Sequence, residues 1–543
     1  MAEGAWQMSE DSLLRLKIDG RPTAAWLAEN LPGVVSAIPG DRLLEQRWFG
    51  SKSQVVGGVT LYDHALFGAD PPSALAIVAV ELGDGSTETY YLPLAVREVE
   101  EAPKMVEDPN VFYLGLESPS GAYILYDACA DAEFNRQVFA RILAGGRFAG
   151  RKGDFVFAPT SAPAEGEPFA SVRRLRGEQS NTSVVYDDTY VRKTYRKLQN
   201  GENPDLEVPR FLTTTVGFAY TPAVAGYAEY KGAGFSAALD SLQAFVANSG
   251  DGWQYTLTHL EGLYQHAQAM APQQSPHGPS RGIEELVRNH SAGYLAEIRR
   301  LGEITGQMHC ALASDESDPA FAPEPVDRED LATWVAAMGA QLAAAVHLIS
   351  TKEANYPPDV RTQLGIMRGQ EPALRERIRG LMALAGAPNL RKIRHHGDYH
   401  LGQVLRTAEG FVVLDFEGEP ARSLAERRAK TLALKDVAGM LRSFDYAVYA
   451  GLFMLGPEAD RGPLETVGLV WEHLAVDAYL DGYFAQTRAK AASFLPPTSD
   501  LLEQCLTVFT LDKAIYEMLY EINNRPAWLR IPLQYIVSLV DHG

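Results

Sequence analysis

The residues best suited to do chemistry lie in 395–417, which reads HHGDYHLGQVLRTAEGFVVLDFE. Asp398 is followed five positions later by Gln403, and Asp415 closes the apolar run that follows the next turn. An amide oxygen and a carboxylate are ligands of the kind that Mg²⁺ binds. A carboxylate outside the metal shell is free to take a proton from a hydroxyl. The pattern therefore predicts Gln403 and Asp415 as metal ligands and Asp398 as a general base.

A tight hairpin would bring these side chains together. VLRT and FVVL are predicted strands on either side of a three-residue loop that ends at Gly410, where a positive φ is needed. If Thr407 pairs with Phe411, the antiparallel register sets Gln403 opposite Asp415. An Asp base, an Asn or Gln five residues on and a second metal-binding Asp after a hairpin form the layout of a phosphotransferase catalytic loop.

Two other interpretations fit the same stretch. Four side chains could ligate a metal as in dinuclear metallohydrolases: His395, His396, Asp398 and His400. A zinc site usually needs further imidazoles or thiolates, and the chain has twelve His and no closely spaced Cys pair. The Asp and His side chains could instead only cap the turns of a hairpin. Glu417 is either a further metal ligand or a cap of the GEP turn, and we favour the cap.

A second block, 170–250, predicts a phosphate-binding hairpin. Small polar residues in the turn between two strands let backbone N–H groups approach a triphosphate. Lys193, on the next strand, is predicted to contact the phosphates, with Glu207 as its partner in a helix that Asn203 caps. The alternative places Lys193 on a solvated face and Glu207 only at the positive helix end. The candidate turn residues are Gly177, Ser180, Asn181, Thr182 and Ser183, and the backbone of Ala244 and Val246 is the candidate for adenine contact.

The joined pattern HHGDYHLGQVL…VLDFEGEPARSLAERRAK…DVAGMLRSFDYA resembles the bacterial maltokinases, within the aminoglycoside phosphotransferase-like kinases. RGEQSNTS, the C-terminal segment and, more weakly, RWFGSK add to the similarity. The resemblance implies a bilobal, protein-kinase-like α+β fold that uses ATP and Mg²⁺. It also implies phosphorylation of maltose to maltose 1-phosphate, in the route linking trehalose to α-glucan, and an association with trehalose synthase.

The acceptor sugar is expected beside Asp398, gripped by charged and amide side chains and an aromatic platform. The candidates are His396, Asp445, Tyr446, Tyr516, Glu517, Glu521, Asn524 and Arg525. Glu517, Glu521 and Asn524 share one helix face by their spacing, although a solvated polar face has the same spacing. Some relatives of the maltokinases phosphorylate glucosamine, so a glucosamine kinase is the alternative function. A non-catalytic partner of trehalose synthase is a third, which the intact catalytic residues disfavour.

Composition limits the partners. The chain has 543 residues, 46 % of them hydrophobic, and a net charge of −20. This charge disfavours nucleic acids and anionic membranes as partners. No apolar run approaches the ~18 residues of a membrane span, and no signal peptide pattern is present. Three separated cysteines fit buried thiols in a reducing compartment. We expect a cytoplasmic protein that acts on a small-molecule sugar.

Three segments are expected along the chain. Residues 1–105 form an N-terminal cap with an early amphipathic helix and antiparallel strands. Residues 106–250 complete the ATP-binding lobe, and 251–543 form a helical lobe with the catalytic loop and sugar site. Within that lobe, the pattern of apolar residues predicts helices at 284–312, 327–349, 357–383, 424–451, 462–490 and 499–524.

Overall fold

The structure, a computed structural model, has two compact units, Met1–Ala247 and Asn248–Gly543. The first is built on two β-sheets and the second is mostly helical, which confirms the α+β class with a strand-rich first half. The residues that the structure describes are 15–101, 108, 111–161, 169–175, 180–270, 279–352, 356–456, 461–490 and 492–541.

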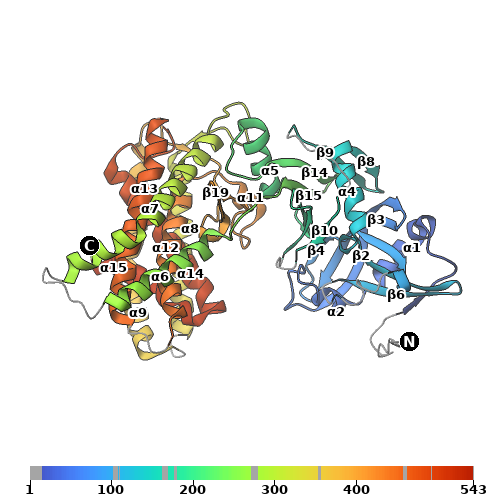
Figure 1. The fold of residues 1–543 in the computed structure, drawn as a ribbon, viewed down its shortest axis with the longest axis horizontal. Helices are drawn as coiled ribbons and strands as arrows, with labels where there is room; N and C mark the ends of the chain where they lie inside the picture. The colour runs from blue at the N-terminus through green and yellow to red at the C-terminus, as the bar shows by residue number, and fades with distance from the viewer. Residues whose placement is uncertain are drawn as a thin grey trace. The chain divides into compact units, whose positions relative to one another are not determined.

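The first sheet carries the helices α1 (Ala24–Ser36) and α2 (Gly40–Leu44), and α1 packs on β2 and β3. Strands from both sides of residue 105 pair in this sheet, so the expected segments 1–105 and 106–250 share it (Figure 1). Its strand order is β1 (Arg15–Lys17), β6 (Tyr113–Ser118), β7 (Gly121–Asp127), β5 (Leu94–Glu98), β3 (Pro72–Leu82), β4 (Thr87–Tyr91) and β13 (Lys197–Leu198), with β2 (Val56–Ala69) also paired to β3.

The prediction of an early amphipathic helix is partly wrong. Residues Arg15–Lys17 form β1, which pairs in parallel with β6. The helix begins only at Ala24, where the Thr23 side chain accepts a hydrogen bond from the Trp26 N–H. Gly20, at a φ of 78°, lies between the two elements. Pairing with β6 satisfies the hydrogen-bonding groups of the β1 backbone. This stabilisation outweighs the preference for a helix that the spacing of the apolar residues indicates.

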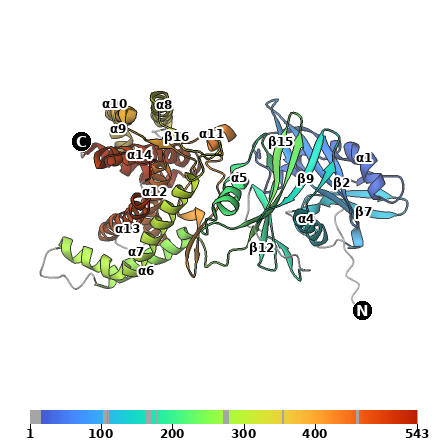
Figure 2. The ribbon, with the colours of Figure 1, turned by 90° about the horizontal axis from the view of Figure 1, so that it is seen from above.

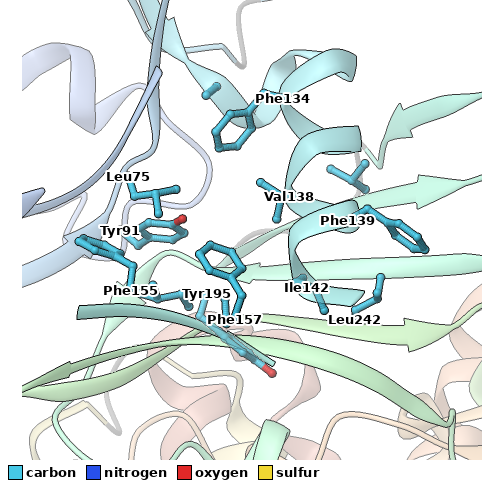
Figure 3. Close-up of a cluster of buried hydrophobic side chains, with 14 of the residues drawn as sticks. Leu75, Tyr91, Phe134, Val138, Phe139, Ile142, Phe155, Phe157, Tyr195 and Leu242 are labelled. Atoms are coloured by element: carbon cyan, nitrogen blue, oxygen red, sulfur yellow. The ribbon is translucent and has the colours of Figure 1, made fainter. Parts of the chain in front are cut away.

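The second sheet supports the helix α4 (Ala132–Ala144), which packs on β9 and β14 (Figure 2). Asp131 caps the start of α4, and Gly145, at a φ of 69°, ends it. Phe134, Val138 and Phe139 of α4 join Phe155 and Phe157 of β9 in a buried cluster (Figure 3). The strand order is β10 (Val172–Arg174), β11 (Asn181–Tyr186), β12 (Tyr190–Tyr195), β15 (Ser236–Ala244), β14 (Val224–Gly232), β9 (Gly153–Pro159) and β8 (Gly146–Ala149), and α5 (Pro204–Arg210) runs into a π-helical turn, Phe211–Val216.

The second unit is a set of packed helices with two short strand pairs. The long helices α7 and α13 run alongside each other, and α12 packs on both α13 and α14 (Figure 1). The helices are α6 (Gly252–Met270), α7 (Pro279–Leu312), α8 (Arg328–Lys352), α9 (Pro358–Gly369), α10 (Glu371–Arg379), α11 (Leu424–Arg428), α12 (Leu434–Met454), α13 (Arg461–Ala489), α14 (Ser499–Asn524) and α15 (Arg530–Asp541). The strands are β16 (Glu324–Pro325) with β17 (Arg391–Lys392), and β18 (Val404–Thr407) with β19 (Gly410–Val413).

Three features of this unit differ from expectation. The helix expected over 424–451 is divided into α11 and α12, because the chain takes an extended conformation at Ala429. The single helix expected over 357–383 is divided into α9, α10 and a 3₁₀ segment, because Pro372 starts a new helix rather than continuing the old one. Helix α8 is long and apolar enough to cross a membrane by length and composition, although no such stretch was expected. The same composition suits a helix of a packed bundle, and α8 buries Leu331, Leu342 and Ile349 and packs on α10 and α14.

Candidate active site

The hairpin of β18 and β19, which carries the predicted metal ligand Gln403 at its start, has a tighter loop than expected. Thr407 pairs with Gly410 rather than with Phe411, so the loop holds two residues instead of three. Gly410 has a φ of 127°, a conformation that side-chain-bearing residues rarely adopt. The shorter loop moves the register, and Gln403 lies opposite Leu414, whose N–H donates to the Gln403 carbonyl at 2.9 Å.

The predicted register, with Gln403 opposite Asp415, is therefore wrong by one residue. The two side chains nevertheless meet, because Gln403 Nε2 donates to Asp415 Oδ2 at 3.1 Å. Asp415 has a left-handed backbone with a φ of 62°, which turns the chain out of β19. Asp tolerates this conformation better than most residues do. The contact between the two predicted ligands thus depends on a turn after the strand, not on strand pairing.

Gln403 and Asp415 fit a hard divalent cation. A half-turn of the Gln403 amide would present its carbonyl oxygen beside the Asp415 carboxylate. Mg²⁺ is commonly held by one or two protein oxygens while phosphates and water complete its shell. Among the residues described, no group of three or more His, Cys, Asp or Glu could hold a metal ion. The alternative of a histidine-rich dinuclear site is therefore not supported.

The backbone that carries Asp398 is fixed from α12. The N–H groups of His396 and Gly397 donate to the two carboxylate oxygens of Asp436 at 2.7 and 2.9 Å. His309 Nε2 lies 3.0 Å from Asp436 Oδ2. Burial opposes the charged form of Asp436, but the hydrogen bond from His309 and the nearby histidines lower its pKa. A buried carboxylate thus stabilises the turn that carries the predicted base.

The Asp398 carboxylate itself is half-buried and contacts a lysine. Lys513 of α14 donates to Asp398 Oδ1 at 3.0 Å and to Glu419 Oε1 at 3.1 Å. His400 Nε2 lies 4.0 Å from Asp398 Oδ2, beyond hydrogen-bond distance. The sequence interpretation missed Lys513, although it lies four residues before Glu517 and eight before Glu521, on the same helix face.

A cavity of about 520 Å³ opens beside Asp398 and lies wholly within the second unit. Most of the predicted sugar contacts line it: Tyr446, Tyr516, Glu517, Glu521 and Arg525. Three aromatic side chains that the sequence interpretation did not select join them: Trp253, Tyr520 and Trp528. The rings of Tyr446 and Trp528 are stacked with their centres 6.3 Å apart. The cavity therefore offers both the charged groups and the aromatic platform that sugar binding was expected to need.

Three predicted sugar contacts lie outside this lining. His396 is 1 % exposed, and its Nε2 lies 2.8 Å from the Leu414 carbonyl oxygen, so its ring supports the turn after β19. Asp445 is buried and forms an ion pair with Arg442. Asn524 is exposed and donates to the Tyr520 carbonyl at 2.8 Å. These three assignments are corrected: the first two side chains support the framework, and the third lies on the surface.

The cavity has an excess of acidic groups. Four carboxylates line it, from Asp251, Asp398, Glu517 and Glu521, against the two cations of Lys513 and Arg525. Arg442, behind the lining, contacts Glu517 Oε2 at 2.9 Å and also pairs with Asp445. Burial raises the pKa of Glu517 and of Glu521, against the opposing effect of their arginine partners. A positively charged ligand group would relieve this excess.

The predicted phosphate-binding lysine has an acidic partner in the first unit. Lys193 Nζ lies 2.8 Å from Asp205 Oδ2, and the Asp205 side chain is 3 % exposed. Asn203 caps α5 by accepting from the Asp205 N–H at 3.0 Å. Glu207, the predicted partner, lies on the same helical turn and is buried. The structure adds Asp205 to the pair, and the contact between Lys193 and Glu207 stays a prediction.

Part of the predicted phosphate turn belongs to a strand. Gly177 lies outside the described residues, and Ser180 is exposed just before β11. Asn181, Thr182 and Ser183 belong to β11 itself, where they pair with β12. Their assignment to a turn is therefore wrong. The Thr182 hydroxyl is buried and accepts from Arg196 Nε at 2.9 Å, so that side chain supports the sheet.

The predicted adenine contacts lie at the end of β15. The Ala244 N–H donates to the Ala223 carbonyl at 2.9 Å, and the Phe245 N–H donates to that of Thr189 at 2.8 Å. The Ala244 N–H is thus already used in a backbone hydrogen bond, and adenine contact by the Ala244 carbonyl stays a prediction. Adenine contact by Val246 stays a prediction.

Comparisons with known proteins bear on both units. Residues 43–131 match the maltokinase N-terminal cap domain. Glucosamine kinases of Streptacidiphilus jiangxiensis and Mycolicibacterium smegmatis are each 26 % identical over 375 residues, which is 68 % of this chain and 73 % and 80 % of theirs. A solved glucosamine kinase in complex with glucosamine, ADP and inorganic phosphate has a TM-score of 0.63 at 21 % identity, covering 94 % of this chain and 99 % of that one. A second crystal form gives 0.65 at 21 % identity, covering 94 % and 100 %.

These likenesses confirm the class expected from the sequence, a phosphotransferase related to the sugar kinases. The particular resemblance to the maltokinases is confirmed over residues 43–131, which match the model of their N-terminal cap domain.

Proposed function

We propose that this protein is an ATP-dependent kinase whose acceptor is an aminosugar, with glucosamine as the reference substrate. The observation that carries the proposal is the acidic cavity around Asp398, where four carboxylates face two cations. Glu517 and Glu521 already have one arginine partner each, Arg442 and Arg525, and an ammonium group would add a further positive charge to this acidic cavity, whereas a neutral sugar would not. The two glucosamine kinases that are 26 % identical to this chain support the same acceptor class.

Maltose is the second candidate, favoured by the cap domain at 43–131. The cavity volume of about 520 Å³ holds a disaccharide as well as a monosaccharide, so volume does not separate the two. The charge of the ligand distinguishes the two candidates, since maltose has no amine. A cytoplasmic location follows from either candidate, because both need ATP. Association with trehalose synthase follows only from the maltose candidate.

The residues take simple roles in this proposal. The acceptor oxygen forms a bond to the γ-phosphorus, the bond from that phosphorus to ADP breaks, and Asp398 takes the hydroxyl proton. Lys193 neutralises charge on the ATP phosphates, with Asp205 or Glu207 orienting it. Gln403 and Asp415 would hold Mg²⁺, which neutralises phosphate charge when bound. Such a complete set of groups disfavours a purely non-catalytic protein.

A sugar panel tests the proposal. We expect the purified protein, with MgATP, to phosphorylate glucosamine with a kcat/KM at least about tenfold above those for glucose and N-acetylglucosamine, because one lost charge pair is worth about 1.4 kcal/mol or more. Glucose lacks the amine, and N-acetylation removes its charge. A higher kcat/KM for maltose, with phosphate on its anomeric oxygen by ³¹P NMR, would replace the first candidate by the second. Turnover of no sugar would reject both.

A further inference from the structure

Lys513 lies between two carboxylates at the edge of the cavity. Its Nζ is 3.0 Å from Asp398 Oδ1 and 3.1 Å from Glu419 Oε1. The Lys513 side chain is 18 % exposed, and that of Glu419 is 3 % exposed. An ammonium group enclosed in this way has few other positions to occupy.

Glu419 is itself anchored. Arg422 Nε donates to Glu419 Oε2 at 2.6 Å, so each Glu419 oxygen has a separate cationic partner. Burial opposes the charged form, but Lys513 and Arg422 lower the pKa of Glu419 to about 2. Glu419 is therefore ionised at neutral pH. Arg422, Glu419, Lys513 and Asp398 form a continuous chain of alternating charge that ends at the predicted base.

Lys513 uses only one of the two oxygens of the base. It contacts Asp398 Oδ1, while His400 Nε2 lies 4.0 Å from Oδ2. Both Asp398 and Lys513 line the cavity. The carboxylate torsion of an Asp is broad and nearly two-fold, so an unheld carboxylate would rotate. Holding Oδ1 leaves Oδ2 as the oxygen that can face an acceptor hydroxyl.

We propose that Lys513, tethered by Glu419, is a positioning residue that orients Asp398 for proton acceptance from the sugar. The inference rests on the proposed kinase function and adds a residue to it. When Oδ2 takes the proton, Asp398 becomes neutral, and the Lys513 ammonium keeps Glu419 as its counterion. No unpaired buried cation is then left behind, which makes the proton transfer less costly.

A double-mutant cycle tests this proposal on the full-length protein with glucosamine and MgATP. Asp398→Asn is expected to lower kcat by about 10²–10⁴-fold, the usual contribution of a general base. Lys513→Met is expected to lower kcat by about 10–10²-fold, since misplacement of a reacting group costs this much. The KM values for sugar and ATP should stay within about threefold. Because Lys513 acts through the base, Lys513→Met should add less than about threefold in the Asp398→Asn background.

Lys392 provides a matched control. Its side chain is 17 % exposed and lies between Asp330, at 2.5 Å, and Glu324, at 3.6 Å, so it is enclosed as Lys513 is. It does not line the cavity. Lys392→Met should leave kcat unchanged. If Lys513→Met does not fold, as judged by its thermal melting, Glu419→Gln replaces it in the cycle. This variant removes the tether but keeps the base, and it should lower kcat by about three- to tenfold with the same dependence on Asp398.

The results distinguish a failure of the proposed kinase function from a failure of the positioning role of Lys513. If the wild-type protein turns over no sugar, the proposed function fails. If the wild type is active and Lys513→Met lowers kcat by the same factor in both backgrounds, Lys513 acts independently of Asp398 and the positioning role is rejected. A rise in the KM for glucosamine with kcat retained would also reject it, because that result assigns Lys513 to substrate binding.

Discussion

At the residue scale, one backbone angle decides whether the two predicted metal ligands meet. Asp415 has a φ of 62° and leaves β19 in a left-handed conformation, so its carboxylate reaches Gln403 although the two are not opposite each other in the ladder. Glu417 follows two residues later, and its carbonyl accepts from Arg427 Nη1 at 3.0 Å. The sequence left open whether the Glu417 carboxylate is also a ligand.

Two substitutions resolve this question. Asp415→Asn removes a charged ligand and is expected to raise the Mg²⁺ concentration for half-maximal activity by about tenfold or more, because Mg²⁺ prefers carboxylate oxygen. Glu417→Gln should leave that concentration within about twofold if the carboxylate only caps the turn. Magnesium titrations of the initial rate at saturating ATP and sugar provide both values. A large rise for Glu417→Gln would make this residue a ligand, and no change for Asp415→Asn would remove Asp415 from the site.

At the element scale, the close packing of α7 on α13 depends on glycine. A Cβ on Gly302 would lie 2.0 Å from the Tyr479 carbonyl oxygen, and backbone cannot move aside as a flexible side chain can. Gly302→Ala is expected to lower the free energy of unfolding by about 1–3 kcal/mol or more through overpacking. Gly293, on the same helix, has open space around it. Gly293→Ala should stabilise the protein by up to about 1 kcal/mol. Urea unfolding of both variants measures the difference, and equal effects would contradict the packing argument.

Helix α13 also carries a carboxyl whose titration is expected to make the stability of the protein depend on pH. Burial, with Asp445 nearby, raises the pKa of Glu472 to about 8, against the opposing effect of Arg442. Because the folded-state pKa lies above the ordinary value of 4.5, the stabilising contribution of Glu472 is present below pH 4.5 and is lost as the pH rises to about 8. Glu472→Gln should therefore gain stability relative to wild type between pH 5 and pH 8, by more than about 1 kcal/mol. Thermal unfolding at both pH values checks this.

Asp481→Asn is the control for that experiment, since the Asp481 side chain on the same helix is 76 % exposed. It should change the stability difference between the two pH values by less than about 0.5 kcal/mol. If Glu472→Gln behaves like this control, or loses stability at pH 8, Glu472 is charged at little cost in the folded protein.

The elements that the sequence predicts well are those with local signals. The helix over residues 499–524 has its bounds confirmed by α14. The strands β8, β9 and β14 were not predicted separately. Strand β9 pairs with its neighbour β8 and β14 with its neighbour β15, but the pairing of β9 with β14, which joins these two hairpins, links segments far apart in sequence. The same limit explains the missed residues. Asp436, Glu419 and Lys513 reach the catalytic turn through contacts 39 to 115 residues apart, which no local pattern reveals.

At the scale of the whole molecule, the two compact units divide the predicted chemistry between them. Lys193 and Asp205 lie in the first unit, whereas Asp398, Gln403, Asp415 and the sugar cavity lie in the second. The second unit also has buried apolar side chains of its own, among them Leu301, Ile304 and Met308. If the chain is divided between the two units, we therefore expect the second unit to bind the sugar but not to transfer phosphate from ATP.

A fragment of residues 248–543 tests this division. It keeps the contact between the Ser249 N–H and the Arg406 carbonyl, at 2.9 Å, and all residues that line the cavity. We expect the fragment to bind glucosamine with a Kd within about tenfold of the full chain, or about 1.4 kcal/mol. It should show no phosphoryl transfer, because it lacks Lys193. Calorimetry with glucosamine gives the Kd, and circular dichroism melting shows whether the fragment is folded. A folded fragment that fails to bind the sugar, while the full chain binds it, would show that the first unit completes the acceptor site.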